Sequence, residues 1–145
     1  MAHHTFIFNP GCWLGEGLIT IQGATEQIRF FTKWGIARTA SGGLSATQTV
    51  ELEAVEEHVV TSYNFEDIQE KSFAVLLESD AIGRVIGQGI IEPNTIAWEF
   101  HSPLLEGFEL YERLANGDYR LHAEYSSTSH YRTVIEGKIW KKSED

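Results

Sequence analysis

The sequence predicts an all-β protein that closes into an antiparallel up-and-down β-barrel of about eight to ten strands. Three observations support this prediction. Short segments rich in Val, Ile, Thr, Tyr, Phe and Trp follow one another along the chain, at intervals of about 8 to 14 residues. Several of them alternate apolar and polar side chains, and the connections between them are short. No segment has the periodicity of a long amphipathic helix.

The first half of the chain contains five of these segments. They are Trp13–Gln22, Gln27–Ala37, Ala46–Ala54, His58–Phe65 and Ser72–Glu78. In the third segment Val50 and Leu52 share one face while Glu51 lies on the other, as in a strand with one buried side. One short helical turn is expected over Asn64–Lys71, with Asn64 as its N-cap.

The second half contains five more segments. They are Arg84–Ile91, Thr95–His101, Phe108–Leu114, Tyr119–Ser126 and Tyr131–Lys141. Alternation in three of them predicts the inward-facing sets Ile96, Trp98 and Phe100; Leu121, Ala123 and Tyr125; and Tyr131, Thr133, Ile135, Gly137 and Ile139. Asn116-Gly117 suits a two-residue type I′ hairpin turn, and it is the strongest hairpin signal in the chain.

A meander of this length must satisfy the backbone groups of its outermost strands. Closure into a barrel removes both edges, and a barrel of this size holds packed side chains or one small ligand. A β-sandwich is the structural alternative, but its crossings usually need longer connections. With 145 residues and no linker-like segment, the chain is expected to be a single domain over residues 1–145.

The composition excludes several classes of partner. Eleven Lys and Arg against 21 Asp and Glu give a net charge of −10, which disfavours nucleic acids and anionic membranes. No apolar run approaches the roughly 18 residues of a membrane span, and the N-terminus lacks the pattern of a secretory signal. The single cysteine, Cys12, cannot form an intramolecular disulfide. These features favour a cytoplasmic location.

The segment Gly11-Cys12-Trp13-Leu14-Gly15-Glu16-Gly17 carries a resemblance to a known group of barrels. Its Gly-x-Trp resembles the first strand of lipocalin-like (calycin) proteins, and the longer Gly-x-Trp-x-Gly-x-Gly is similar to nitrobindin-like and fatty-acid-binding-protein-like barrels. The resemblance implies that Trp13 closes one end of a barrel. A large ring followed by two glycines on one face also lets a strand bend sharply and approach another backbone closely.

Nitrobindin-like barrels bind haem through a histidine late in the chain, so the resemblance makes haem binding an alternative function. His122 and His130 are the late histidines. His122 falls on the same face as Arg120 and Glu124, which is expected to face solvent, and His130 follows a run of Ser and Thr. Neither has a clear haem setting, so no cofactor is predicted. The histidines and Cys12 show no metal-ligand spacing, and no nucleophile-elbow or phosphate-loop motif is present.

Seven polar or aromatic residues are candidates for a ligand site inside the barrel. They are Trp34, Tyr63, Trp98, Glu112, Tyr125, Tyr131 and Arg132. Buried Tyr and Trp side chains usually need a polar partner, supplied by a ligand or by another side chain. Glu112 shares a face with Phe108 and Leu110, so an inward orientation is expected, with Arg132 as its partner if the last strand is locally shifted.

The sequence thus favours a barrel that binds a small hydrophobic or amphipathic ligand rather than an enzyme. An enzyme on the same scaffold is the first alternative. It would use Tyr63, Glu112, Tyr125 and Arg132, as the fold of allene oxide cyclases and phenolic acid decarboxylases suggests by resemblance. A filled barrel acting as an interaction protein is a further alternative, and the sequence leaves the oligomeric state open.

Overall fold

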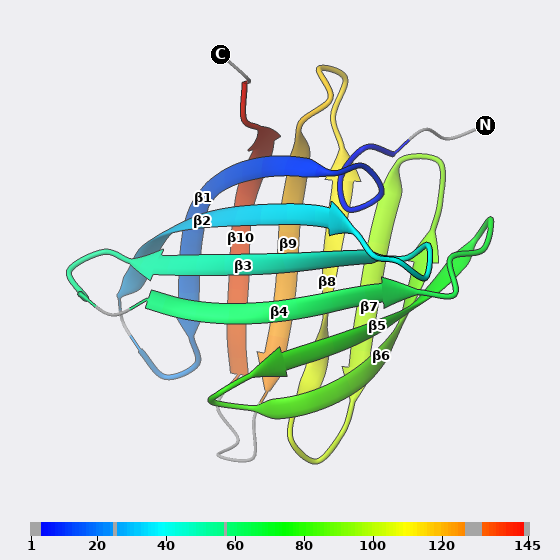
Figure 1. Cartoon of the computed structure of the whole chain (residues 1–145). Helices are drawn as coiled ribbons and strands as arrows, with labels where there is room; N and C mark the ends of the chain where they lie inside the picture. The colour runs from blue at the N-terminus through cyan, green and yellow to red at the C-terminus, as the bar shows by residue number, and fades with distance from the viewer. Residues whose placement is uncertain (1–3, 25, 57, 127–131, 144–145) are drawn as a thin grey trace.

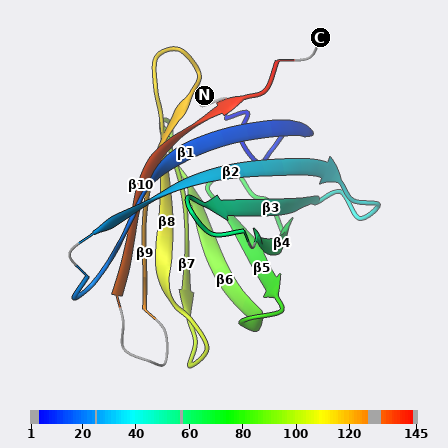
Figure 2. The same ribbon diagram turned by 90° about the vertical axis from the view of Figure 1, so that its left-hand side faces the viewer.

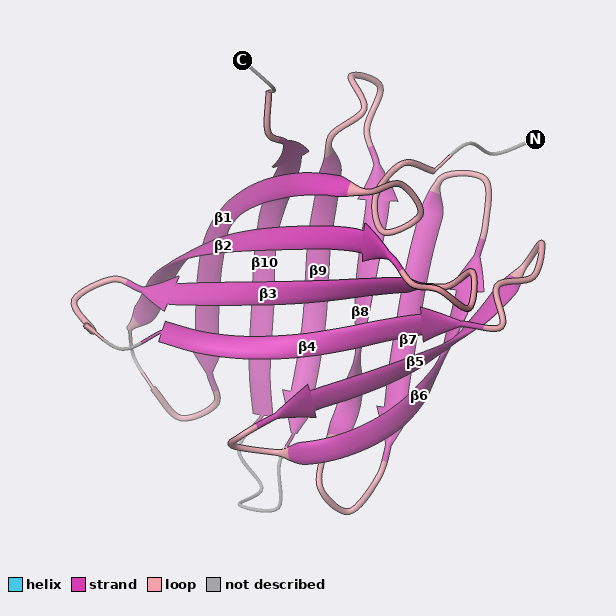
Figure 3. Cartoon of the chain, in the orientation of Figure 1, coloured by secondary structure: helices cyan, strands magenta, loops and turns pink. Residues whose placement is uncertain are grey.

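The computed structural model describes residues 4–24, 26–56, 58–126 and 132–143, and the only regular secondary structure in these ranges is β-strand (Figure 1; Figure 3). The described ranges contain ten strands. Their bounds are β1 Gly11–Ile21, β2 Gln27–Arg38, β3 Leu44–Leu52, β4 His58–Glu66, β5 Ser72–Ser79, β6 Gly83–Ile91, β7 Thr95–His101, β8 Glu106–Arg113, β9 Tyr119–Ser126 and β10 Arg132–Lys141. All ten predicted strands are present, with ends that differ by a few residues.

Each strand pairs antiparallel with the next one in the chain, and β1 pairs with β10 to close the barrel. The closing register runs from Trp13 opposite Lys141 to Ile21 opposite Thr133. The predicted all-β, closed up-and-down barrel is therefore confirmed. Figures 1 and 2 show that β2, β3 and β4 run across the direction of β8, β9 and β10, and that β1 curves from one direction to the other.

The curvature of β1 depends on glycines that face the interior. Gly17 lies opposite Gly137 of β10, and a Cβ atom on Gly17 would lie 2.6 Å from the Cα of Gly137. A side chain at either position would therefore force the two backbones apart. Trp13 precedes these glycines on the same face and is buried against Phe6 and Tyr119. The predicted close approach at this motif is present.

Residues 4–10 cover one end of the barrel, which we call the closed end. Phe6 and Ile7 are fully buried, and the Phe6 ring lies 5.3 Å from the rings of both Trp13 and Trp34. His4 anchors the segment: its Nδ1 lies 2.7 Å from the Tyr119 hydroxyl and its Nε2 lies 2.6 Å from the Glu92 carbonyl oxygen. This segment fills the closed end with side chains from outside the sheet.

The helical turn predicted over Asn64–Lys71 is wrong. Asn64 belongs to β4, where it pairs with Leu76 of β5, and residues 67–71 form an irregular connection. Tyr63 and Phe65 are both buried inside the barrel, and this alternate burial extends the strand through Glu66. Burial of an alternating face outweighs the local capping signal of Asn64.

The hairpin between β8 and β9 also differs from the prediction. The Leu114 N–H donates to the Asp118 carbonyl, so three residues, 115–117, form the loop instead of two. Gly117 has a φ of +92°, the left-handed conformation that ends a three-residue hairpin loop. The longer loop shifts the β8–β9 register by one residue relative to a two-residue Asn-Gly turn. Such a shift exchanges the inner and outer faces of β8.

Candidate functional site

The half of the barrel opposite the closed end contains a cavity of about 290 Å³. Its walls come from nearly every strand and from two of the connections. The lining residues are Ile19, Phe30, Gln48, Val50, Val59, Thr61, Tyr63, Leu77, Ile82, Leu105, Glu109, Leu121, Ala123, Tyr125, Thr133 and Ile135. Most of them are apolar, as in pockets that bind small organic molecules.

The cavity opens at the end of the barrel that carries the β1–β2, β3–β4 and β5–β6 connections. Figure 1 shows where these three connections lie. Exposure of the lining residues shows the direction of the opening. Glu109 and Tyr63 at the floor are 5% and 3% exposed, whereas Val59 near the rim is 48% exposed. A molecule that entered from this end would therefore meet Glu109 and its neighbours last.

Four side chains form a hydrogen-bonded cluster at the floor, which we call the Glu109 cluster: Tyr63, Glu109, Tyr111 and Tyr125. The Tyr111 hydroxyl donates to Oε1 of Glu109 at 2.5 Å, and the Tyr63 hydroxyl donates to Oε2 at 3.2 Å. The Tyr125 hydroxyl donates to the same Oε2. Tyr63, Glu109 and Tyr125 line the cavity, and Tyr111 lies behind them in the packed half.

Three strands position this cluster. Tyr63 comes from β4, Glu109 and Tyr111 from β8, and Tyr125 from β9. Glu109 lies opposite Trp98 on one side and opposite Ala123 on the other. The small Ala123 side chain leaves space above the carboxyl group, and this space is part of the cavity.

Burial governs the ionisation of the cluster. It raises the pKa of Glu109, while the hydrogen bonds from Tyr111, Tyr125 and Tyr63 act in the opposite direction. The pKa values of these three tyrosines are raised well above 10, first by burial and then by the nearby Glu109 charge. The carboxyl group is therefore the member of the cluster that exchanges a proton, and the hydroxyl groups remain protonated donors.

The structure brings some of the predicted site residues together. Tyr63 and Tyr125 both line the cavity and both donate to Glu109. Trp34 and Trp98 point inward, but they are fully buried behind Tyr63 and do not line the cavity. The indole N–H groups of both tryptophans have no hydrogen-bond partner, although Trp98 lies close enough to help lower the pKa of Glu109.

The expected inward orientation of Glu112 is wrong, and so is its pairing with Arg132. Glu112 lies on the outer face of β8 and forms an exposed ion pair with Arg120 at 3.4 Å. Arg132 lies on the outer face of β10 and pairs with Glu124. The register shift at the β8–β9 loop places Glu112 outside, and β10 keeps regular alternation rather than a local shift. Tyr131 lies outside the described residues.

Sequence reasoning missed Glu109, the central residue of the site. The face of β8 that contains Phe108 and Leu110 looked like the interior face because it is the more apolar one. In the structure Leu110 is 36% exposed, while Glu109 and Tyr111 are buried. The available signal was the alternation of β9: with a three-residue loop, Ala123 lies opposite Glu109 and requires it to point inward.

The described residues do not suit haem or a metal ion. His4 is at the closed end, and ring nitrogens of His58, His101 and His122 lie within 3.5 Å of carboxylate oxygens of outer-face glutamates. None of these histidines lines the cavity, which is also much smaller than a tetrapyrrole. His130 lies outside the described residues. Within the described ranges there is no group of three or more His, Cys, Asp or Glu that could hold a metal ion, and no helix that could span a membrane.

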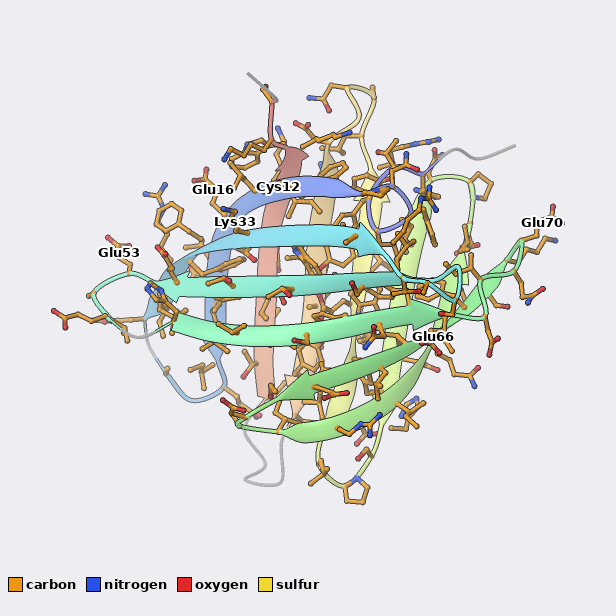
Figure 4. All side chains as sticks on the ribbon, in the orientation of Figure 1. Cys12, Glu16, Lys33, Glu53, Glu66 and Glu70 are labelled. Carbon is orange, nitrogen blue, oxygen red and sulfur yellow. The ribbon has the colours of Figure 1, made fainter. Side chains whose placement is uncertain are left out.

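Cys12, the only cysteine, belongs to the outer face of β1, as Figure 4 shows together with Glu16. It is separated from the cavity by the sheet itself. Its backbone carbonyl accepts a hydrogen bond from the Lys142 N–H, which extends the pairing of β1 with the end of β10.

Comparison with known proteins shows similarity in fold. No protein-family model matches the chain. No curated protein matches its sequence. Among solved structures, it is similar to an S-type phycobiliprotein lyase, CPES, from Guillardia theta, with a TM-score of 0.74 and 8% sequence identity. The similarity covers 94% of this chain and 90% of the lyase chain, so the two proteins share the whole barrel.

Proposed function

We propose that the barrel binds a small, largely apolar molecule whose polar head contacts the Glu109 cluster. The observation that carries this proposal is a cavity of about 290 Å³ that is apolar along its walls and polar at its floor. An apolar wall provides affinity through burial, and a few fixed polar groups orient the ligand. The filled barrel of an interaction protein would lack such a cavity.

The volume limits the size of the ligand. An apolar protein cavity of about 150 Å³ holds benzene, so about 290 Å³ corresponds to roughly a dozen non-hydrogen atoms. A larger molecule would have to extend through the open end. The cavity is thus matched to a short-chain or single-ring compound.

A cavity-blocking variant with a matched control tests this function. Ile135→Trp places a large ring in the cavity from β10, whereas Val134→Trp places the same ring on the outer face of that strand. The neutral probe is 4-phenylbutanol, measured by isothermal titration calorimetry. We expect binding to the native protein and to the Val134 variant, and at least tenfold weaker binding to the Ile135 variant. Absence of binding to the native protein, or equal binding to all three, would contradict the proposal.

A second candidate function is an enzyme that moves a proton on a small substrate. The specific observation in its favour is the convergence of one carboxyl group and two tyrosine hydroxyl groups in a single cavity, with pKa values shifted by burial. A structurally similar protein is a phycobiliprotein lyase, so a barrel of this shape serves an enzyme in that case. Glu109 takes the place that the sequence assigned to Glu112.

Hydrogen–deuterium exchange tests this activity without knowledge of the natural substrate. The Glu109 carboxylate would remove a proton next to the carbonyl of 4-phenylbutan-2-one, and a deuteron from solvent would replace it. We expect exchange in D₂O, followed by NMR, to be faster with native protein than with Glu109→Gln. Glu112→Gln, on the outer face of the same strand, should exchange like native protein. Equal rates for all proteins would exclude this role.

A further inference from the structure

The polar floor of the cavity offers hydrogen-bond acceptors and no cation. The described residues include all eleven Lys and Arg of the chain, and none of them lines the cavity. Glu109 is the only Asp or Glu among the described lining residues. The other polar lining groups, Gln48, Thr61 and Thr133, are neutral. An anionic head, such as that of a fatty acid, would find no positive partner here.

The two tyrosines that line the cavity also favour a ligand that donates hydrogen bonds. The hydroxyl protons of Tyr63 and Tyr125 are already directed at Glu109. Their oxygen atoms therefore present lone pairs, rather than protons, to a molecule in the cavity. A ligand that reaches the floor meets a carboxyl group and two phenolic acceptors together.

The aromatic rings that line the cavity also favour a cationic ligand. Phe30, Tyr63 and Tyr125 contribute their rings to the cavity, and the faces of such rings attract cations. The open end adds a negative field: its described connections contain Glu26, Glu53, Glu56 and Asp80 and no Lys or Arg. Figure 4 shows Glu53 projecting from the β3–β4 connection. A cationic molecule is attracted to this end and an anion is repelled.

We propose that the ligand carries a basic nitrogen, and that its protonated amine pairs with the carboxylate of Glu109 while its apolar body fills the cavity. This inference rests on the proposed function and specifies its ligand class. Pairing compensates a carboxylate that is otherwise buried without a cation, and such charge-assisted hydrogen bonds are about twice as strong as neutral ones.

Three ligands with the same apolar body and different head groups test which head-group charge the cavity prefers. They are 4-phenylbutylamine, 4-phenylbutanol and 4-phenylbutanoate, measured by titration calorimetry at neutral pH and low salt. We expect the amine to bind at least tenfold more tightly than the alcohol, and the carboxylate to bind more weakly than both. If the alcohol binds as tightly as the amine, the inference is overturned while the proposed function stands. If none of the three binds, the proposed function fails as well.

Substitution identifies the partner of the amine. In Glu109→Gln we expect amine affinity to fall at least tenfold and to approach that of the alcohol, whose own affinity changes less than threefold. Glu112→Gln should leave all three affinities unchanged, because that carboxylate lies on the outer face and pairs with Arg120. An amine preference that survives Glu109→Gln would assign the effect to the aromatic rings and overturn the pairing with Glu109.

The pH dependence of binding provides a test on native protein, should the Glu109 variant fail to fold. The groups that face Glu109 are Tyr63 from β4, Tyr111 from its own strand, Tyr125 from β9 and the Trp98 indole from β7. All of them remain neutral while Glu109 titrates, because burial raises the pKa values of the three tyrosines well above 10 and the indole carries no charge. Amine affinity should therefore rise with pH as Glu109 ionises, while alcohol affinity does not. Parallel pH profiles for the two ligands would contradict the inference.

Discussion

Glu109 shows how a single residue can oppose stability and define a site. Its carboxyl group is buried among three tyrosines, and burial raises its pKa above the 4.5 of an exposed glutamate. The folded protein therefore binds this proton more tightly than the unfolded chain does. The stability contribution of Glu109 is fully present below pH 4.5 and is lost as the pH rises through the pKa of the folded state.

The first prediction is that Glu109→Gln stabilises the protein at neutral and alkaline pH. Glutamine keeps the shape and an acceptor oxygen for the tyrosines, and it removes the cost of a buried charge. We expect the thermal midpoint of the variant to exceed that of native protein increasingly from pH 5 to pH 8, as measured by circular dichroism. Glu112→Gln is the control and should show no such trend. A variant that is less stable than native protein throughout this range would contradict the prediction.

His4 has the opposite dependence on pH. Burial lowers its pKa below the ordinary 6.5, so the folded state disfavours the protonated ring. Its contribution to stability is present above pH 6.5 and is lost as the pH falls through the pKa of the folded state. In its neutral form the ring donates from Nε2 to the Glu92 carbonyl oxygen and accepts the Tyr119 hydroxyl at Nδ1.

The second prediction is that His4→Gln flattens the loss of stability between pH 7 and pH 5. Urea unfolding at several pH values measures this difference directly. The exposed His101 is the control, and His101→Gln should retain the native pH profile. An unchanged profile in the His4 variant would mean that unfolding does not change the protonation of this histidine in this pH range.

At the scale of a single strand, β1 shows how small residues shape the barrel. Gly15 and Gly17 face the interior, where Ile139 and the β10 backbone leave no space for a side chain. The Gly-x-Trp-x-Gly-x-Gly motif is therefore explained by packing: Trp13 fills the closed end, and the glycines allow β1 to curve against β10. On its outer face the same strand exposes Glu16 and Leu18, and Cys12 is half-buried there.

The third prediction concerns this close approach. Gly17→Ala should destabilise the protein by about 1–3 kcal/mol, the usual cost of overpacking, because its Cβ would overlap the β10 backbone. Gly35→Ala on the outer face of neighbouring β2 is the control, since a Cβ there meets nothing within 4 Å. We expect it to be neutral or slightly stabilising. Chemical unfolding measures both, and equal effects would show that the space at Gly17 is not limiting.

The buried face of strand β8 cannot be predicted from the alternation of its own residues. Both of its faces carry apolar residues and a glutamate, so alternation by itself does not identify the buried one. A loop of three residues rather than two decides it, by placing Glu109 opposite Ala123. By contrast, the inward orientation of Ile96, Trp98 and Phe100 in β7 is confirmed, because all the large apolar residues of that strand lie on one face.

For the whole molecule, closure is the dominant constraint. β1 and β10 are far apart in sequence, and their pairing leaves every strand with two neighbours. The pairing extends to the hydrogen bond between the Lys142 N–H and the Cys12 carbonyl. Open edges would expose unpaired backbone groups and invite association with other chains.

The fourth prediction is that loss of β10 prevents folding of the rest. A chain that ends at Ser126 would have β1 and β9 as open edges and would lack Ile139, which is fully buried. We expect it to lose the cooperative thermal transition and the near-ultraviolet dichroism of native protein, and to aggregate. A chain that ends at Lys142 retains β10 and should behave as native. A cooperative transition in the shorter chain would show that closure is dispensable.

The sequence alone was sufficient for the class of fold, the number of strands and most of their inward faces. These features depend on local composition, on alternation and on short connections, which are properties of neighbouring residues. It was also sufficient to select Tyr63 and Tyr125 as residues of the interior. Only the tertiary structure decided that residues 4–10 cover one end and that a cavity remains at the other. It also decided that Glu109, rather than Glu112, lies at the cavity floor. The first two outcomes depend on contacts between distant segments. The third depends on strand register, and a difference of one residue in the β8–β9 loop reverses it.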